Sequence, residues 1–181
     1  SQNELNYVAK VDEEFQVLLN ELHETQDYPN ATLPIDQWVY KALEKRQSPG
    51  GKKEAWDQFS KRNGDFAHAG RAFLLHKVGS LPEGVPYPPQ YLLENYQNKL
   101  AILRPVLDRY VRHGLRRSES ELDHQKAELV TQRLRMLGSQ ITETGIRPCA
   151  SPVGRIMAYA SSKTTAISTI LTSEMQALGG D

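Results

Sequence analysis

Two adjacent helical patterns within residues 88–141 constrain the fold of this chain more than any other feature. In each pattern apolar side chains recur every three or four residues, which places them on one face of an α-helix. The first face carries Leu92, Tyr96, Leu100, Leu103, Leu107 and Tyr110. The second face carries Leu122, Leu129, Val130, Leu134, Leu137 and Ile141. These patterns predict two helices, each roughly 35 Å long at a rise of about 1.5 Å per residue.

A short basic segment, residues 113–117, separates the two patterns and is here called the elbow. Gly114 suits the end of a helix, and Ser118 with Glu121 has the spacing of a capping box for the next one. Because only a few residues lie between the patterns, we predict an antiparallel hairpin rather than one continuous rod. Pro105 removes a backbone donor inside the first arm and is expected to kink it.

Shorter helical patterns precede the hairpin, at residues 5–25, 34–46, 53–62 and 66–78. In the last of these, Asp65 is expected to be the N-cap, and small side chains should let another helix approach closely. The predicted fold is therefore all-α, a helical bundle of about five to seven helices built around a long antiparallel helical hairpin at residues 88–141.

Two segments outside these patterns differ from them in composition. Residues 79–90 contain four prolines, which predict an ordered crossing loop or an extended polyproline segment. Residues 155–178 are rich in alanine, serine and threonine and fit a helix on length. Their β-branched side chains leave a strand open as the alternative.

The overall composition fits a single helical domain spanning residues 1–181. With 39% hydrophobic and 24% charged residues, the chain is too apolar for general disorder. Its formal net charge is zero, but residues 1–30 carry seven acidic side chains and one basic, whereas residues 31–80 carry five and nine. Residues 1–27 are therefore expected to form an acidic helix that docks separately on the basic body or recruits a basic partner.

Several functional classes are disfavoured by what the sequence does not contain. The single cysteine, Cys149, excludes an internal disulfide and a multi-cysteine zinc site. Without a signal pattern or an apolar stretch of membrane-spanning length, no membrane partner is predicted and a cytoplasmic location is the default. Whether Ser1 and Asp181 are natural chain ends stays open.

No arrangement typical of catalysis is found along the chain. The five histidines lack metal-binding spacing, and Glu121 with His124 supplies the Glu-x-x-His spacing of di-iron bundles only once. We therefore predict no catalytic, cofactor-binding or metal-ligating residue and no cofactor. A catalytic site assembled from residues far apart in sequence stays open.

The leading functional hypothesis rests on the N-terminal helical pattern. Its apolar residues form a narrow stripe, as in a seam between helices. These predicted partner-binding residues are Val8, Val11, Phe15, Leu18 and Leu22. The chain is accordingly predicted to be a non-enzymatic helical module for protein–protein or interdomain assembly, with a protein partner or as a homo-oligomer.

The alternative hypothesis rests on arginines at and before the elbow. If the hairpin folds as predicted, these side chains gather at its tip and are predicted to bind nucleic acid. They are Arg109, Arg112, Arg116 and Arg117. In the competing structural interpretation they cap a helix end and pair with carboxylates just across the turn. Those carboxylates belong to Glu119, Glu121 and Asp123.

A family resemblance gives this alternative a context. The residues that carry it are Ser161-Ser162-Lys163, Ile167, Ile170-Leu171 and Leu178-Gly179-Gly180. Residues 161–180 thereby resemble the segment that opens the second ATPase lobe of chromatin-remodeller-type helicases, in which a Ser-Lys pair starts a helix leading into the lobe's first strand. The resemblance implies that this chain is a helical segment of a helicase-like ATPase, although no ATP-binding motif is present in it.

Overall fold

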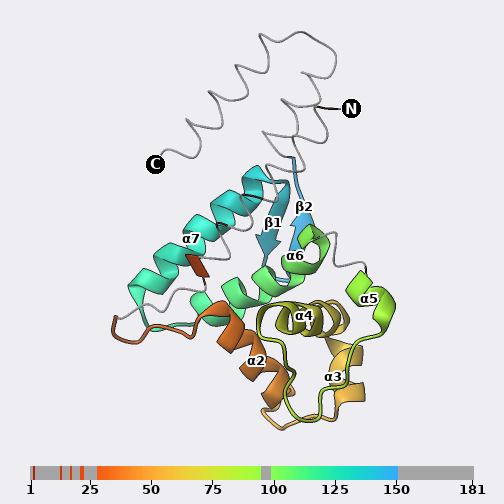
Figure 1. The fold of residues 1–181 in the computed structure, drawn as a ribbon. Coiled ribbons are helices and arrows are strands. Elements are labelled where there is room, and N and C mark those ends of the chain that lie inside the picture. The colour runs from red at the N-terminus through yellow and green to blue at the C-terminus, as the bar shows by residue number, and fades with distance from the viewer. Residues whose placement is uncertain are drawn as a thin grey trace.

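The computed structural model describes residues 28–94 and 99–150, together with residues 2, 13, 17, 21 and 22. This part of the protein is mostly helical and includes one two-stranded sheet (Figure 1). Its elements, in chain order, are α2 (Ile35–Lys45), α3 (Trp56–Arg62), α4 (Gly64–Lys77), α5 (Gln90–Glu94), α6 (Lys99–Arg109), the π-helix η2 (Tyr110–Leu115), α7 (Glu121–Met136), β1 (Ser139–Thr142) and β2 (Gly145–Pro148). The prediction of a mostly helical protein is confirmed, but an all-α fold omits the sheet.

Helix α4 lies at the centre of the core and packs against α2, α3 and α6. A Cβ added at Gly70 would lie 3.3 Å from Leu43 Cδ1 and 3.6 Å from Val39 Cγ1, so glycine lets α2 and α4 approach closely. The predicted close approach is confirmed. Asp65, however, is not the N-cap, because α4 begins at Gly64 and Asp65 lies in its first turn.

Helix α2 supplies the second layer of the core. Its residues Ile35, Val39 and Leu43 are four apart, share one face, and are fully buried. The helix ends at Arg46, whose φ of +43° is left-handed. The buried Arg46 guanidinium donates hydrogen bonds to the carbonyl oxygens of Leu43, Glu54 and Glu83. Arg46 thus ties the end of α2 to the two loops that flank α3 and α4.

The chain passes from α6 directly into η2, and Pro105 lies within α6. At the end of η2 the backbone N–H of Arg116 donates to the Val111 oxygen, five residues back, at 3.0 Å. Gly114 was predicted to cap a helix, but it lies inside η2. A Cβ there would be 3.1 Å from Tyr110 Cδ1 and 3.2 Å from Trp38 Nε1. Glycine is required at this position by close packing rather than by helix termination.

Helix α7 follows the elbow, as predicted, and buries Val130 and Leu134 of the predicted face, but its first turns bury other residues. Its buried residues are Asp123, Ala127, Val130 and Leu134. Leu122 and Leu129 are 50% and 51% exposed, so the prediction that they face the core is wrong. The buried stripe of the first turns lies one residue along from the predicted one, a rotation of about 100° around the helix.

The second arm of the predicted hairpin is also shorter than expected. Helix α7 ends at Met136, and Gly138 adopts a φ of +89° just beyond it. Strand β1 then pairs antiparallel with β2, in register from Ser139 opposite Pro148 to Thr142 opposite Gly145. Ile141 is therefore a buried strand residue rather than the last residue of a helix. The sheet packs on α7 through β1 and on α6 through β2.

Within the described residues, no helix combines the length and the apolar character needed to cross a lipid bilayer.

Candidate functional site

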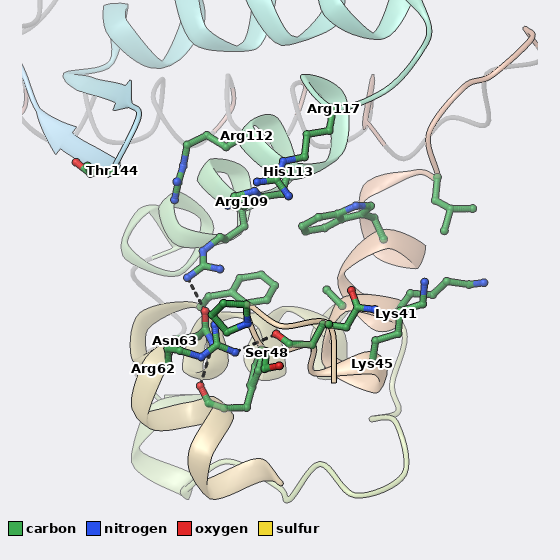
Figure 2. A pocket seen from close by; sticks show the side chains of 18 residues that line it. Lys41, Lys45, Ser48, Arg62, Asn63, Arg109, Arg112, His113, Arg117 and Thr144 are labelled. Atoms are coloured by element: carbon green, nitrogen blue, oxygen red, sulfur yellow. Dashed lines mark hydrogen bonds between the residues drawn. The ribbon is translucent and has the colours of Figure 1, made fainter. Parts of the chain in front are cut away.

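A hollow of about 890 Å³ opens beside the elbow, between η2 on one side and α2, α3 and the start of α4 on the other (Figure 2). We call it the basic hollow, because six of its lining side chains are permanently cationic. They are Lys41, Lys45, Arg62, Arg109, Arg112 and Arg117. Among the described residues that line it, none is an aspartate or a glutamate. A concave surface of one charge sign concentrates the field that attracts an oppositely charged ligand.

Arg109 projects from the end of α6 into the basic hollow and is held there by two contacts. Its Nη2 donates a hydrogen bond of 2.8 Å to Asn63 Oδ1, and its guanidinium carbon lies 5.3 Å from the centre of the Phe66 ring. Burial, reinforced by the charge of Arg112, lowers the pKa of Arg109. The guanidinium is still charged at neutral pH, since arginine is not deprotonated in proteins. Arg109 is therefore a positioned, partly desolvated cation without a carboxylate partner among the described residues.

Arg112 is held more firmly, by a carboxylate on its own helical face. Its Nε and Nη2 donate to both oxygens of Asp108, at 2.8 and 2.7 Å, and its Nη1 donates to the Glu143 carbonyl oxygen at 3.2 Å. Such a two-point pair is geometrically specific and charge-assisted. It largely neutralises Arg112 and fixes the turn between β1 and β2 to η2.

Arg62 is also paired, whereas the remaining three cations line the rim of the hollow. Arg62 Nη2 lies 2.5 Å from Glu54 Oε2 and also donates to the Gln47 carbonyl oxygen. Lys41, Lys45 and Arg117 are exposed. No ion pair involves these three among the described residues. With Arg109 they leave four cationic groups of the basic hollow without a carboxylate partner in the described part of the chain.

His113 lines the hollow on η2, among the arginines. Its Nδ1 atom is buried and has no hydrogen-bond partner among the described residues. Burial, together with the charges of Arg117, Arg112 and Arg109, lowers the pKa of His113 to about 4. The imidazole is therefore neutral at physiological pH in the unliganded protein.

The wall behind these groups is aromatic and tightly packed. Trp38 makes edge-to-face contacts with Phe66, at 6.3 Å between ring centres, and with Tyr110, at 5.7 Å. The Tyr110 hydroxyl donates to the Leu33 carbonyl oxygen at 2.7 Å. Because Phe66 is 4% exposed and Tyr110 is 1% exposed, neither ring presents a face to the hollow. Trp38, which is only partly buried, is the aromatic side chain of the wall with accessible surface at the hollow.

The outer side of the elbow is built around a carboxylate. Asp123, 1% exposed, accepts hydrogen bonds from the Tyr28 hydroxyl at 2.5 Å, the Thr32 backbone N–H at 2.8 Å and the Ser118 hydroxyl at 2.5 Å. Burial, together with the Asp123 carboxylate, raises the pKa of Tyr28. We call these four residues the Asp123 network. It attaches residues 28–32 to the start of α7.

The structure separates the four predicted nucleic-acid-binding residues. Arg109, Arg112 and Arg117 line the basic hollow, whereas Arg116 is outside its lining and donates to Thr131 Oγ1 at 3.3 Å. None of the four pairs with Glu119, Glu121 or Asp123 among the described interactions. The predicted ion pairs between these arginines and Glu119, Glu121 and Asp123 are therefore wrong. Arg112 takes Asp108 one turn back in its own helix instead.

The predicted capping box at the elbow does not form. Ser120 is the N-cap residue of α7, with no side-chain capping bond, and the Ser118 hydroxyl donates to Asp123 and to the Asn30 carbonyl oxygen instead. The buried carboxylate is a better acceptor for this hydroxyl, so tertiary contacts replace the local cap.

Sequence reasoning missed half of the basic hollow. Lys41, Lys45, Arg62 and Asn63 come from segments that show nothing unusual in their own sequence. The one available signal was the excess of basic over acidic residues between 31 and 80. It indicated a positive body without indicating where the charges meet.

Most of the predicted partner-binding stripe lies outside the described residues. This applies to Val8, Val11, Phe15 and Leu18, and the residues of the helicase resemblance, 161–180, lie outside as well. Leu22 is described, and at 1% exposure it belongs to the core of the chain itself. Beside it, Glu21 Oε2 accepts a hydrogen bond from Arg133 Nη1 at 2.6 Å.

No three His, Cys, Asp or Glu side chains within the described part of the chain come together to hold a metal ion. The groups in the basic hollow are donors and cations, which bind phosphate or carboxylate oxygens. Comparisons with protein-family models, with curated proteins and with solved structures find no match to this chain.

Proposed function

We propose that this protein binds nucleic acid through the sugar–phosphate backbone, in the basic hollow beside the elbow. The observation that carries the proposal is the lining of the hollow, in which six Lys or Arg side chains occur without an Asp or Glu among the described residues. Cations that neutralise phosphates release counterions from the nucleic acid, and this term dominates sequence-independent affinity.

The arrangement of the cations favours a chain of phosphates over a single small anion. They come from α2, α3, α6, η2 and the end of the elbow, so they occupy different walls of the hollow. Arg109 is fixed by Asn63 and Phe66 and provides a rigid central contact. Lys41, Lys45 and Arg117 are exposed at the rim and can follow a flexible backbone. A single strand fits such a concave surface better than a wide duplex.

The aromatic wall indicates that recognition is independent of sequence. Proteins that stack bases present exposed aromatic faces, whereas Phe66 and Phe59 are 4% and 5% exposed. Trp38, the partly exposed aromatic residue of the lining, is engaged edge-to-face with Phe66 and Tyr110. Contacts would therefore be made to phosphates, which position a strand and carry no sequence information. We expect similar affinity for oligonucleotides of different base composition.

A charge-removal experiment tests this proposal. In the triple variant Lys41→Ala, Lys45→Ala, Arg117→Ala, the affinity for a rhodamine-labelled oligo(dT) of about twelve nucleotides, measured by fluorescence anisotropy, should fall about tenfold or more at low salt. The slope of log affinity against log salt should become shallower by roughly 2, at about 0.7 per lost contact to a single strand.

A matched control removes the same charge from outside the hollow. Lys52, Lys53 and Lys61 are exposed and are not among the lining residues of the hollow. Their triple alanine variant should keep the salt slope and most of the affinity of the unmodified protein. Equal losses in the two triple variants would show that binding follows net charge alone, and failure of the unmodified protein to bind at low salt would end the proposal.

A second candidate function is assembly with a protein partner, as the N-terminal stripe first suggested. One structural observation favours it independently of the hollow: Leu122 and Leu129, seven residues apart on one face of α7, are each about half exposed. The double variant Leu122→Gln, Leu129→Gln should then lower the mass measured by size-exclusion chromatography with light scattering. A monomer in both proteins over a wide concentration range would count against a homo-oligomer.

The resemblance of residues 161–180 supports placing this binding activity in a larger machine. We propose that the chain is the nucleic-acid-contacting helical segment of a helicase-like ATPase. This part of the proposal is tested by the coding sequence beyond Asp181, where the motifs of a second ATPase lobe are expected. An unrelated sequence there would refute the helicase-like ATPase. The proposal of nucleic-acid binding would then depend on the oligo(dT) experiment alone.

A further inference from the structure

His113 is the one titratable group of the basic hollow that lies among its arginines and carries no charge at neutral pH. Arg109 and Arg112 precede it on the same helical turns, and Arg117 follows one turn later. Across the hollow, Lys41 and Lys45 project from α2 and Arg62 from α3. An imidazole in this position would lie beside a phosphate that is bound by the cations of the hollow.

The carboxylates near this imidazole are already engaged. Asp108, in α6, is bound by two nitrogen atoms of Arg112. Asp123, the buried carboxylate of α7, accepts hydrogen bonds from Tyr28, Thr32 and Ser118 on the far side of the elbow. No carboxylate of the described residues lines the hollow, and Asp108, whose charge favours an imidazolium at His113, is outweighed by burial and by the three arginines.

The Nδ1 atom of His113 supplies a second, independent observation. It is buried and has no hydrogen-bond partner among the described residues, although an unsatisfied buried polar atom destabilises the folded protein. Few buried polar atoms in folded proteins stay unpaired, and those that do call for an explanation, such as a bound ligand or ion. Because Nδ1 is shielded from solvent in the unliganded protein, an anion in the hollow acts on this ring through its charge, which favours the protonated form.

We propose that binding of a nucleic-acid phosphate in the basic hollow is coupled to protonation of His113, which becomes an additional cation of the occupied site. This inference rests on the proposed function and specifies how the same site is regulated. Affinity for nucleic acid then increases as the pH falls, although the phosphodiester itself keeps its charge.

The sign of the effect follows from linkage. In the free protein, burial and the three arginines hold the pKa of His113 at about 4, so the ring is neutral. A bound phosphate offsets the repulsion from the guanidiniums and stabilises the charged imidazolium, which raises the pKa. Binding thus takes up a proton, and affinity rises as the pH falls through the pKa of the bound state. If that pKa returned to about 6.5, affinity would rise roughly 30-fold between pH ~7.5 and ~5.

The test compares three proteins at constant ionic strength. Affinity for the rhodamine-labelled oligo(dT) is measured by anisotropy from pH ~5 to ~7.5 for the unmodified protein, His113→Gln and His76→Gln. His76 is an exposed histidine in the last turn of α4, outside the lining of the hollow. The unmodified protein and His76→Gln should bind at least about tenfold more tightly at the lower pH, and His113→Gln should lose most of this gain.

The outcomes separate this inference from the proposed function. Binding with the same pH dependence in His113→Gln and the unmodified protein overturns the coupling and leaves nucleic-acid binding in place. Absence of binding in the unmodified protein at both pH values overturns the two together. If His113→Gln does not fold, NMR titration of the His113 ring in the unmodified protein decides, because its pKa must rise when saturating oligo(dT) is added. An unchanged pKa refutes the coupling.

Discussion

The two sides of the elbow are close in sequence and opposite in electrostatic design. On the inner side, Arg109 and Arg117 line a concave surface without carboxylate partners among the described residues. On the outer side, the single buried carboxylate of Asp123 is satisfied by three donors. The outer side uses its charge to hold segments of the chain together, whereas the inner side leaves positive charge available. Available charge is what a ligand recognises.

The largest expected effect is on the outer side. Asp123→Ala should lower the free energy of unfolding by about 3 kcal/mol, because three buried or half-buried donors lose a charged acceptor. Urea denaturation monitored by circular dichroism measures this change. Glu121→Ala is the matched control on the next exposed position and should change stability by about 0.5 kcal/mol or less. Similar losses in both variants would mean that the Asp123 network is not a stabilising unit.

On the inner side, we expect Arg112 and Arg117 to contribute differently to stability. Arg112→Met and Arg117→Met remove the same charge from the lining of the basic hollow. Only Arg112→Met strands the buried Asp108 carboxylate, so it should cost about 2–3 kcal/mol, against about 0.5 kcal/mol or less for Arg117→Met. Thermal and urea unfolding of both variants checks the difference. Equal stabilities would show that the pair between Arg112 and Asp108 contributes as little as a surface salt bridge.

A smaller effect is expected in the pH dependence of stability. The pKa of His113 is about 4 in the folded protein and near 6.5 when unfolded, so the unfolded chain binds the proton more readily between these values. Stability should therefore fall as the pH drops from about 6.5 toward about 4. His113→Gln should reduce the difference between urea midpoints at pH ~7 and ~5, and His76→Gln should not. An unaltered difference in His113→Gln would show that the ring is not held neutral by its surroundings.

The sequence predicted the helices well where one pattern dominates. Helix α2 spans Ile35–Lys45 against a prediction of 34–46, because apolar residues four apart and a proline at the start leave little ambiguity. The buried face of α7 was predicted correctly at Val130 and Leu134 and wrongly at Leu122 and Leu129. Leu122 and Leu129 compete there with a stripe one residue further on that begins with Asp123. A carboxylate is assigned to the surface unless its partners are known, and Tyr28 and Thr32 lie about ninety residues away.

The sequence pointed to only part of the candidate site. The arginines near the elbow lie within nine residues of one another, at positions 109, 112, 116 and 117, so their clustering is visible as a local pattern. Lys41, Lys45 and Arg62 join them only because α4 packs against both α2 and α6. No local pattern contains that information. The strands at residues 139–148 were missed for a similar reason, since their pairing depends on α6 and α7 as supporting surfaces.

By itself, the sequence determined where most helices form, where the chain turns, and that arginines gather at one turn. These properties depend on neighbours within about four residues, and backbone geometry makes such neighbours predictable. Only the tertiary structure decided which arginines are paired, which face the basic hollow, and that His113 lies uncharged among them. Charge pairing and burial depend on which distant side chains come within a few ångströms, because electrostatic energy is set by separation and by exclusion of water.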